Sequence, residues 1–359
     1  MRTSVSTNSS AHSKVFLGTR GRVLRRLGLS LGHSVHFAAY TKNLPKALGH
    51  APVWMGNDHA RQTFMKKTSV DESALILHGV TITHPDRLVF EEGAITKGEV
   101  ARYYAAVAPF ILEDIQNRPI SLLRCPSGIN ADCFYQRNLG FGLGTDVHPF
   151  VWKYKGRSYK YIYVKDEKGL MEMIQMGVIE IHPWGATIDH VHTPDRMIFD
   201  LDPDPTVPFS EVKRAACDVR DRLKQVGLDS ALKCTGGKGL HVVVSLAPTS
   251  SWEQVKDWAR ALAHTMVREA PNKYVATITK SKRVGKILID FFRNDYTATG
   301  IAGYSLRARP GAPVAVPLQW RELTSLKSAD QFRMDAVLER IQRRPPQKAS
   351  TKQQLPKVQ

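Results

Sequence analysis

The chain has 359 residues, of which 42% are hydrophobic, and its formal net charge is +18. A chain of this size can bury a sizeable core, and it has no run of about 18 apolar residues, so we expect neither a membrane span nor a membrane partner. Its four cysteines form no C-x-x-C pair, so neither a zinc knuckle nor a disulfide framework is expected, and a reducing, intracellular setting is the simplest one.

The basic residues are concentrated at the two ends of the chain. Residues 1–68 contain 11 Lys or Arg and one acidic residue, whereas residues 340–359 contain six Lys or Arg and no acidic residue. The centre, 69–339, has 34 basic and 32 acidic residues. We therefore expect a basic, disordered extension at 1–68, a folded domain at 69–342 and a basic, disordered tail at 343–359. Such tails either add salt-sensitive affinity for nucleic acid or are solvated arms without a role. The Arg- and Ser-rich extension is also typical of an organelle transit peptide.

The first half of the folded region contains one strongly predicted helix. Thr96 is a candidate N-cap with Glu99 three residues later, which is a capping box. Val100, Tyr103 and Val107 follow at helical spacing, so the pattern predicts a helix over 96–115. Order is expected to begin near Leu75. The other expected elements of this half are strands at 119–124, 158–164 and 178–182 and a helix at 170–176.

Strands and helices alternate more clearly in the second half. Ser210 is the expected N-cap of one helix and Gly227 its stop, while Ser250 or Ser251 is the expected N-cap of the next. The expected helices span 210–226 and 252–269, and the expected strands span 196–202, 240–246, 286–292 and 304–308. This order predicts an α/β fold in which helices cover a sheet.

Three carboxylates lie on the expected strands. Asp200 and Asp202 share one face of their strand, because side chains alternate, and Asp290 interrupts an otherwise apolar strand. Taken alone, the first pair could be a solvated strand end, and Asp290 could be paired with an Arg or Lys. Together the three suit Mg²⁺ or Mn²⁺ and the two-metal chemistry of phosphoryl transfer, since hard cations prefer oxygen ligands.

A glycine-rich turn follows at 235–239, with the sequence T-G-G-K-G. Its backbone N–H groups can surround phosphate oxygens, although it lacks the spacing of a Walker A loop and also resembles an ordinary tight hairpin. His182 ends an apolar strand and is either structural or a phosphate donor. The paired aromatics Phe134 and Tyr135 either stack on a base or belong to the core.

The chain resembles a known family through eight collinear segments. It is similar to the polymerase domain of bacterial DNA ligase D, the non-homologous end-joining polymerase of the archaeo-eukaryotic primase superfamily. The resemblance runs from about residue 78 to about residue 330. Its motifs are H-P-D-R-L-V-F with T-K-G-E-V-A-R-Y-Y (84–104), R-P-I-S-L-L-R-C-P-S-G (118–128), C-F-Y-Q-R (133–137), I-E-I-H-P-W-G (179–185), D-R-M-I-F-D-L-D-P (195–203), C-T-G-G-K-G-L-H (234–241), I-T-K-S-K-R-V-G-K-I-L-I-D (278–290) and Y-S-L-R-A-R-P-G-A-P-V-A-V-P-L-Q-W (304–320).

The resemblance implies a primase-like α/β fold, with an RRM-like catalytic module packed on a second α/β module. It assigns metal binding and catalysis to Asp200, Asp202 and Asp290. The residues it assigns to the nucleotide are His182, Thr235, Gly236, Gly237, Lys238, Arg283, Arg307, Phe134 and Tyr135. It assigns the 5′-phosphate of a DNA gap or break to Arg87 and Lys97. The family favours manganese and often prefers ribonucleotides, so two Mn²⁺ or Mg²⁺ ions and an NTP or dNTP substrate are expected.

The implied activity is the extension of 3′ ends and the filling of gaps at DNA breaks in a bacterial cytoplasm, near the nucleoid. Expected partners are gapped or broken DNA, preferably 5′-phosphorylated, together with Ku and a separate ATP-dependent DNA ligase, since the sequence contains no K-x-D-G ligase motif. The alternatives are a stand-alone primase or gap-repair polymerase and a non-catalytic DNA-end-binding module. A monomer is expected. Arg293 departs from the family, because some members have Gln at this position, and its role stays open.

Overall fold

The computed structural model describes residues 74–140, 142–343 and 351–357. The chain divides into two compact units, Met1–Lys67 and Thr68–Gln359, and every described residue belongs to the second. The predicted extension at 1–68 therefore lies outside the described residues. None of the helices in the described part is long and apolar enough to cross a membrane.

A six-stranded sheet, built around one β-α-β-β-α-β unit, forms one module of the described unit. Its strand order is β13-β14-β10-β12-β11-β15, in which only the pairing of β13 with β14 is parallel. The inner order β14-β10-β12-β11 is that of an RRM-like sheet, so the module that the resemblance predicts to be catalytic is present. Its elements are β10 (Arg196–Pro203), α3 (Phe209–Gln225), β11 (Ala231–Cys234), β12 (Leu240–Ser245), α4 (Trp252–Glu269), β13 (Tyr274–Val275), β14 (Ile287–Asp290) and β15 (Val316–Leu318).

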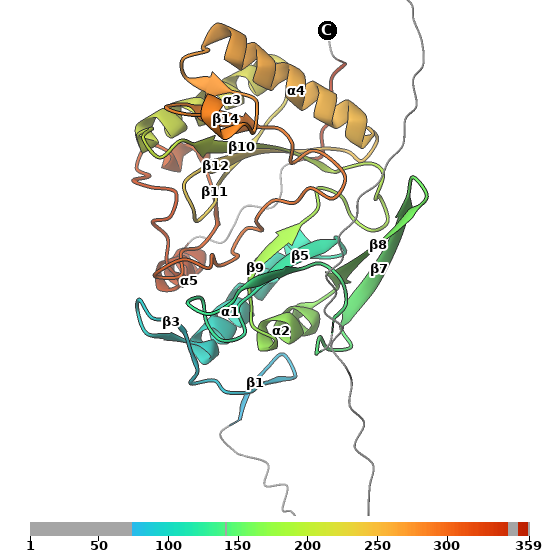
Figure 1. Ribbon diagram of the computed structural model, residues 1–359, viewed down its shortest axis with the longest axis vertical. Coiled ribbons are helices and arrows are strands. Elements are labelled where there is room, and N and C mark those ends of the chain that lie inside the picture. The colour runs from blue at the N-terminus through green and yellow to red at the C-terminus, as the bar shows by residue number, and fades with distance from the viewer. Residues whose placement is uncertain (1–73, 141, 344–350, 358–359) are drawn as a thin grey trace, which may run out of the picture. The chain divides into compact units, whose positions relative to one another are not determined.

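The two faces of this sheet have different partners. Helices α3 and α4 cover one face, as Figure 1 shows at the top of the view. Phe199 and Leu201 of β10 point toward these helices and are fully buried. Asp200 lies on the opposite face, because neighbouring residues of a strand alternate between its faces. The apolar residues of β10 thus anchor the strand while its carboxylates face away from the helices.

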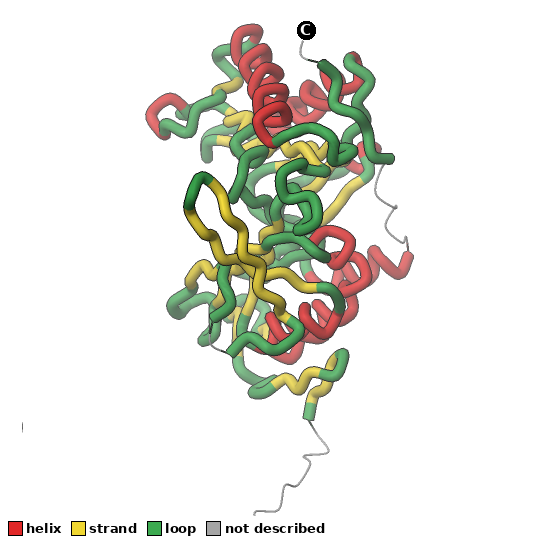
Figure 2. Tube along the Cα trace, turned by 90° about the vertical axis from the view of Figure 1, so that its right-hand side faces the viewer, coloured by secondary structure: helices red, strands yellow, loops and turns green. Residues whose placement is uncertain are grey.

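The second module is a smaller sheet backed by two helices. Strands β6, β5, β8 and β7 follow one another, and β9 pairs with β5. Its elements are β5 (Ile120–Arg124), β6 (Phe134–Gln136), β7 (Val147–Tyr154), β8 (Arg157–Val164), β9 (Val178–Pro183), α1 (Lys97–Ile115) and α2 (Glu167–Gln175). Figure 2 shows the long β7–β8 hairpin extending from this sheet. Two short ribbons precede α1, formed by β1 (Leu75–Leu77) with β2 (Val80–Ile82) and by β3 (Leu88–Phe90) with β4 (Ile95–Thr96).

Helix α1 begins where the sequence predicts it. The Thr96 side chain accepts a hydrogen bond from the Glu99 N–H, and the Glu99 carboxylate accepts one from the Thr96 N–H, which completes the capping box. Tyr103 and Tyr104 of this helix are buried, and their hydroxyls bond to segments more than 70 residues away in sequence. The bond from Tyr103 to the Tyr304 carbonyl, between β14 and β15, therefore ties the second module to the catalytic one.

Two local predictions were wrong. Helix α3 begins after Pro208, so Ser210 lies inside its first turn, whereas Gly227 ends the helix at a positive φ as expected. Residues 304–308 form no strand. Tyr304 has a φ of 66°, and one isolated bridge from Leu306 to Val314 closes a loop. Backbone at positive φ cannot continue a ladder, which explains the difference.

The C-terminal region is more ordered than predicted. Helix α5 (Met334–Arg343) was not expected, and it buries Val337. Residues 351–357 lie against the end of β12, where the Gln353 N–H donates to the Ser245 carbonyl and the Gln353 carbonyl accepts from the Ala247 N–H. The prediction of a disordered tail is therefore wrong for these residues, since their backbone groups find partners at the end of β12.

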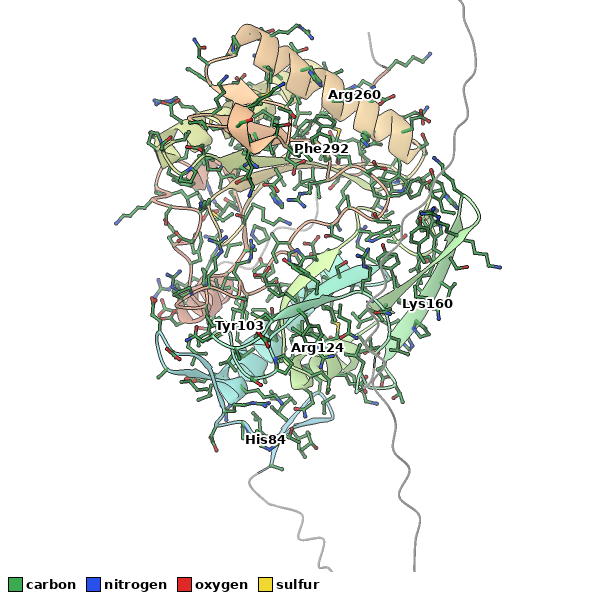
Figure 3. All side chains as sticks on the ribbon, viewed as in Figure 1. His84, Tyr103, Arg124, Lys160, Arg260 and Phe292 are labelled. Carbon is green, nitrogen blue, oxygen red and sulfur yellow. A yellow bond between two sulfur atoms is a disulfide. The ribbon has the colours of Figure 1, made fainter. Side chains whose placement is uncertain are left out.

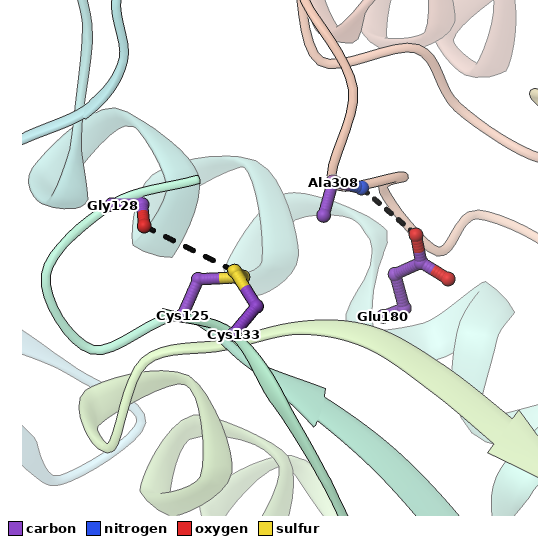
Figure 4. Close-up of a disulfide and its surroundings, with 5 residues drawn as sticks. All are labelled: Cys125, Gly128, Cys133, Glu180 and Ala308. Atoms are coloured by element: carbon purple, nitrogen blue, oxygen red, sulfur yellow. Dashed lines mark hydrogen bonds between the residues drawn. A yellow bond between two sulfur atoms is a disulfide. The ribbon is translucent and has the colours of Figure 1, made fainter. Parts of the chain in front are cut away.

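The cysteine prediction was also wrong. Cys125 and Cys133 form a disulfide across the turn between β5 and β6 (Figure 4). Spacing in the sequence could not reveal it, because the turn brings together two residues that are eight positions apart. The other two cysteines, Cys217 and Cys234, are free thiols.

Candidate active site

A row of four ionisable side chains crosses the face of the six-stranded sheet that lies opposite α3 and α4. Asp200 of β10 has Asp290 of β14 as its cross-strand partner on one side and His241 of β12 on the other, and His241 is in turn paired with Lys233 of β11. Asp202 lies two residues beyond Asp200 on the same face. The antiparallel register therefore brings the three predicted carboxylates to one end of the sheet.

Two arginines contact these carboxylates. The Arg293 Nη2 lies 3.0 Å from the Asp200 Oδ2, and its Nε lies 3.3 Å from the Asp290 Oδ2. Arg283, which precedes β14, forms an ion pair with Asp202. The sequence predicted Arg283 near the nucleotide site but left the role of Arg293 open.

The pKa values of the two buried carboxylates move in opposite directions. Burial alone would raise the pKa of Asp200, but the neighbouring His241 and Arg293 together bring it well below its ordinary value. Burial, reinforced by the adjacent charge of Asp200, raises the pKa of Asp290 to about 6 although Arg293 opposes the shift. Of these two carboxylates, Asp290 is therefore the one whose ionisation the folded protein disfavours, as expected where like charges share one site.

The donor chemistry fits a divalent cation. Asp200 and Asp290 already converge on one positively charged group, the Arg293 guanidinium. Carboxylate oxygens are also the ligands that Mg²⁺ and Mn²⁺ prefer. Within the described ranges, however, no three His, Cys, Asp or Glu side chains are arranged as a ready-made metal site. A metal would thus have to displace the arginines from these carboxylates.

The glycine-rich turn between β11 and β12 lies beside this end of the sheet. The Thr235 hydroxyl donates to the Gly239 carbonyl at 2.9 Å and accepts from the Gly237 N–H at 3.3 Å. Gly236 has a φ of 64°, and Lys238 is exposed at the tip of the turn. The Arg307 Nη1 donates to the Thr235 carbonyl at 2.8 Å, so this arginine joins the predicted nucleotide residues.

A buried carboxylate that the sequence analysis missed connects His182 with Arg307. Glu180 of β9 is 3% exposed, and its Oε2 lies 2.9 Å from the His182 Nε2. Its Oε1 lies 3.1 Å from the Arg307 Nε and accepts from the Ala308 N–H at 2.9 Å. Figure 4 shows this last bond. The signal was available, since Glu180 interrupts an apolar strand and shares a face with His182.

Exposed aromatic side chains flank this network. Phe134 and Tyr135 of β6 are 46% and 71% exposed, so the alternative that they belong to the core is wrong. The Tyr135 ring lies 6.1 Å from the His182 ring, and the Arg124 guanidinium lies 5.3 Å from the Phe134 ring centre. The disulfide joins Cys133, directly before Phe134, to the end of β5, and so constrains the strand that carries both rings.

The two residues predicted to bind a 5′-phosphate lie away from the carboxylates. Arg87 is exposed, whereas Lys97 is 4% exposed, and its Nζ donates to the Thr83 carbonyl and the Gln175 Oε1. Burial, with a contribution from Arg87, lowers the pKa of Lys97 to about 8. The Arg87 N–H donates to the His84 carbonyl, so His84 marks the position of Arg87. In Figure 3, His84 lies near the bottom of the view, and Phe292 of the catalytic module lies near the top. The residues predicted to bind the 5′-phosphate are therefore separate from the carboxylates predicted to bind metal.

An RRM-like sheet with carboxylates on adjacent strands, packed on a second α/β module, defines a protein of the primase-polymerase class. Residues 96–347 match the family described as the LigD primase-polymerase domain. The structure is similar to the polymerase domain from Mycobacterium tuberculosis ligase D in complex with DNA, with a TM-score of 0.69 and 28% identity over 74% of this chain and 95% of that one.

Longer relatives match the same region. The chain is 34% identical over 276 residues to the multifunctional non-homologous end joining protein LigD of Pseudomonas aeruginosa. This match covers 77% of this chain and 33% of that protein. It is 30% identical over 264 residues to the corresponding protein of Mycolicibacterium smegmatis, covering 73% and 34%. The chain therefore belongs to the LigD primase-polymerase domain family, and the match spans about a third of the length of these relatives. Both the predicted resemblance and the predicted fold class are confirmed.

Proposed function

We propose that this chain is a metal-dependent nucleotidyltransferase that extends 3′ ends and fills gaps at broken DNA in non-homologous end joining. The observation that carries the proposal is the convergence of Asp200, Asp202 and Asp290 at one end of the sheet, beside the glycine-rich turn. Membership of the LigD primase-polymerase domain family supports it, as does the similarity to a polymerase domain that is in complex with DNA.

The carboxylates Asp200, Asp202 and Asp290 would hold Mn²⁺ or Mg²⁺ ions. When bound, such ions supply positive charge that favours ionisation of the 3′-hydroxyl and offsets the charge of the departing pyrophosphate. Thr235, Lys238 and Arg307 are placed to bind the triphosphate of an NTP or dNTP through a hydroxyl, an ammonium and a guanidinium group. Charge-assisted bonds of this kind stabilise the negative charge that develops during phosphoryl transfer.

His182 and the exposed aromatics complete the proposed nucleotide site. Glu180 holds the imidazole of His182 and the guanidinium of Arg307 in fixed positions through short polar contacts. Phe134 and Tyr135 present exposed rings on which a base or the template strand can stack. We place the 5′-phosphate of the gap at Arg87, with the buried ammonium of Lys97 behind it. End joining would also require Ku to gather the ends and an ATP-dependent ligase activity to seal them.

The test is primer extension on a gapped, 5′-phosphorylated duplex with Mn²⁺ or Mg²⁺ and with each of the NTPs and dNTPs. The variant Asp200→Ala/Asp202→Ala should lose all extension. The control is Asp195→Asn, which removes a buried carboxylate that pairs with Arg118 outside the proposed site, and it should retain extension. No extension by the wild-type chain under any condition would reject the polymerase and favour an end-binding module.

A second measurement tests the end-joining role. The affinity for gapped DNA should fall when the 5′-phosphate is removed, and Arg87→Ala should abolish that difference because it removes the exposed cation at the proposed phosphate position. Equal affinity of the wild-type chain for phosphorylated and unphosphorylated gaps would instead favour a primase or gap-repair polymerase that is not specific for broken ends.

A further inference from the structure

Arg293 lies between two carboxylates of the proposed metal site. Its Nη2 and Nε are 3.0 and 3.2 Å from the Asp200 Oδ2, and its Nε is also 3.3 Å from the Asp290 Oδ2. Its Nη1 donates to the Thr299 carbonyl at 3.3 Å. Among the residues that the structure describes, Arg293 is the one whose side chain lies within ion-pair distance of both carboxylates.

The backbone after β14 is built to aim Arg293 at this position. The neighbouring Asn294 is 1% exposed, and its side chain bonds to both the N–H and the carbonyl of Ile198 on β10. It also donates to the Phe291 carbonyl. These bonds fix the turn that follows Asp290, so the path of the chain directs the Arg293 side chain back over the carboxylates.

The contact between Arg293 and the two carboxylates is close, but only the arginine side chain has room to leave. Asp200 and Asp290 are buried, and their side chains are 12% and 11% exposed, whereas the side chain of Arg293 is 40% exposed. Two adjacent buried carboxylates repel each other unless a cation lies between them. Since the guanidinium reaches solvent, it can leave without unfolding the sheet, while the carboxylates cannot move far.

We propose that Arg293 is an internal counter-ion that takes the place of the metal between Asp200 and Asp290, and that metal binding requires its displacement. This inference rests on the proposed function. A cation such as Mg²⁺ binds carboxylate oxygens at about 2.0–2.1 Å, and a guanidinium that contacts the same oxygens would repel the ion. The displaced guanidinium needs a new anionic partner, and the triphosphate of the incoming nucleotide supplies one. Metal and nucleotide should therefore bind cooperatively, each raising the affinity of the other by the same factor.

Arg283 does not play the same part. It forms an ion pair with Asp202, whose side chain is 44% exposed and therefore partly solvated. Solvent screens such an exposed pair, so its loss changes the charge balance of the site less than the loss of Arg293. The inference is accordingly specific to Arg293, and a Gln at this position, as in some family members, should leave the two carboxylates open to a metal.

The experiment measures Mn²⁺ binding by calorimetry, without DNA, in the presence and absence of a non-hydrolysable α,β-methylene NTP analogue. We compare the wild-type chain with Arg293→Gln, which removes the charge, and with Arg293→Lys, which retains it. The control is Arg268→Gln, because Arg268 is an exposed arginine on α4, which covers the opposite face of the same sheet. Circular dichroism establishes that each variant is folded.

Without nucleotide, Arg293→Gln should bind Mn²⁺ about tenfold more tightly than the wild-type chain, which corresponds to about 1.4 kcal/mol. Arg293→Lys and Arg268→Gln should stay within about twofold of wild type. The nucleotide analogue should raise the Mn²⁺ affinity of the wild-type chain more than that of Arg293→Gln, since the variant has no guanidinium to relocate.

Equal or weaker Mn²⁺ binding by folded Arg293→Gln would overturn the inference, as would an equal gain from Arg268→Gln, which would reveal a net-charge effect. The inference would also be overturned if neither the wild-type chain nor any variant bound Mn²⁺. Because binding is read without polymerisation, the predicted pattern of Mn²⁺ affinities would support the inference even if primer extension failed. Conversely, extension with unchanged Mn²⁺ affinities would refute the inference alone.

Discussion

Replacing Glu180 by Gln removes one charge from the buried network behind the proposed triphosphate site and leaves its shape almost unchanged. The amide oxygen can still accept from the Ala308 N–H, but the carboxylate's hydrogen bond with His182 and its ion pair with Arg307 are lost. We therefore expect two separable effects. The protein should be less stable, and the two residues proposed to bind the nucleotide should be less well positioned.

The size of the stability effect follows from the pKa of Glu180. Burial alone would raise it, but the hydrogen bond from His182 and the charge of Arg307 outweigh burial and lower it from 4.5 to about 2. A carboxylate whose pKa is lowered by folding stabilises the fold at pH values above its pKa in the unfolded chain. This stabilisation is lost as the pH falls through its pKa in the folded protein. A shift of this size corresponds to about 3 kcal/mol above pH 5. Glu180→Gln should therefore lose about 2–3 kcal/mol at pH 7.5, and the loss should shrink below pH 4.5.

Two assays test this expectation. Urea unfolding at pH 7.5 and pH 4 gives the free energy of unfolding, and steady-state primer extension gives the KM for the NTP. The KM should rise about tenfold, which corresponds to about 1.4 kcal/mol, while the affinity for 5′-phosphorylated DNA stays constant. The matched control is Asp195→Asn, which breaks the buried pair with Arg118 at 2.6 Å and should lower stability without changing the KM.

The reasoning would be refuted if Glu180→Gln and Asp195→Asn raised the KM equally, because a general loss of stability would then explain both. An unchanged KM in a destabilised Glu180→Gln would show that Glu180 supports the fold but does not position His182 or Arg307.

Three further predictions follow from the same structure. Asp290→Asn should stabilise the metal-free protein at pH 7.5 by about 2 kcal/mol in urea unfolding. The reason is that the pKa of Asp290, raised to about 6, makes the wild-type protein less stable as pH rises from 4 through 6. Cys125→Ser/Cys133→Ser should lower the free energy of unfolding by about 2–3 kcal/mol, and dithiothreitol should destabilise the wild-type chain but not this variant. Gly239→Ala should lower the melting temperature sharply, because its Cβ would lie 2.1 Å from a backbone carbonyl oxygen of β10. In contrast, Gly237→Ala should be tolerated, because its Cβ would meet nothing closer than 3.4 Å.

Much of the fold could be predicted from short-range patterns in the sequence. The capping box of Thr96 and Glu99 and the helical spacing that follows determine where α1 begins. The alternation of apolar and acidic residues in β10 places Asp200 on the face opposite Phe199. These predictions were confirmed because capping and strand alternation depend on residues within one or two turns of each other. The predicted strand at 304–308 was wrong, because Tyr304 lies at positive φ and a single bridge from Leu306 to Val314 closes a loop there, which the apolar and polar pattern alone does not reveal.

Several features of the candidate site depend on contacts between residues far apart in the sequence. The register of β10 with β14 brings Asp290 beside Asp200. The turn after β14 then brings the Arg293 guanidinium within ion-pair distance of both carboxylates. Folding likewise brings Glu180 to Arg307, 127 positions later in the chain. By itself the sequence determined which residue types the site contains and which strand faces carry them. Only the tertiary structure decided which charges neighbour one another, because strand register and loop closure depend on packing of the whole domain rather than on local spacing.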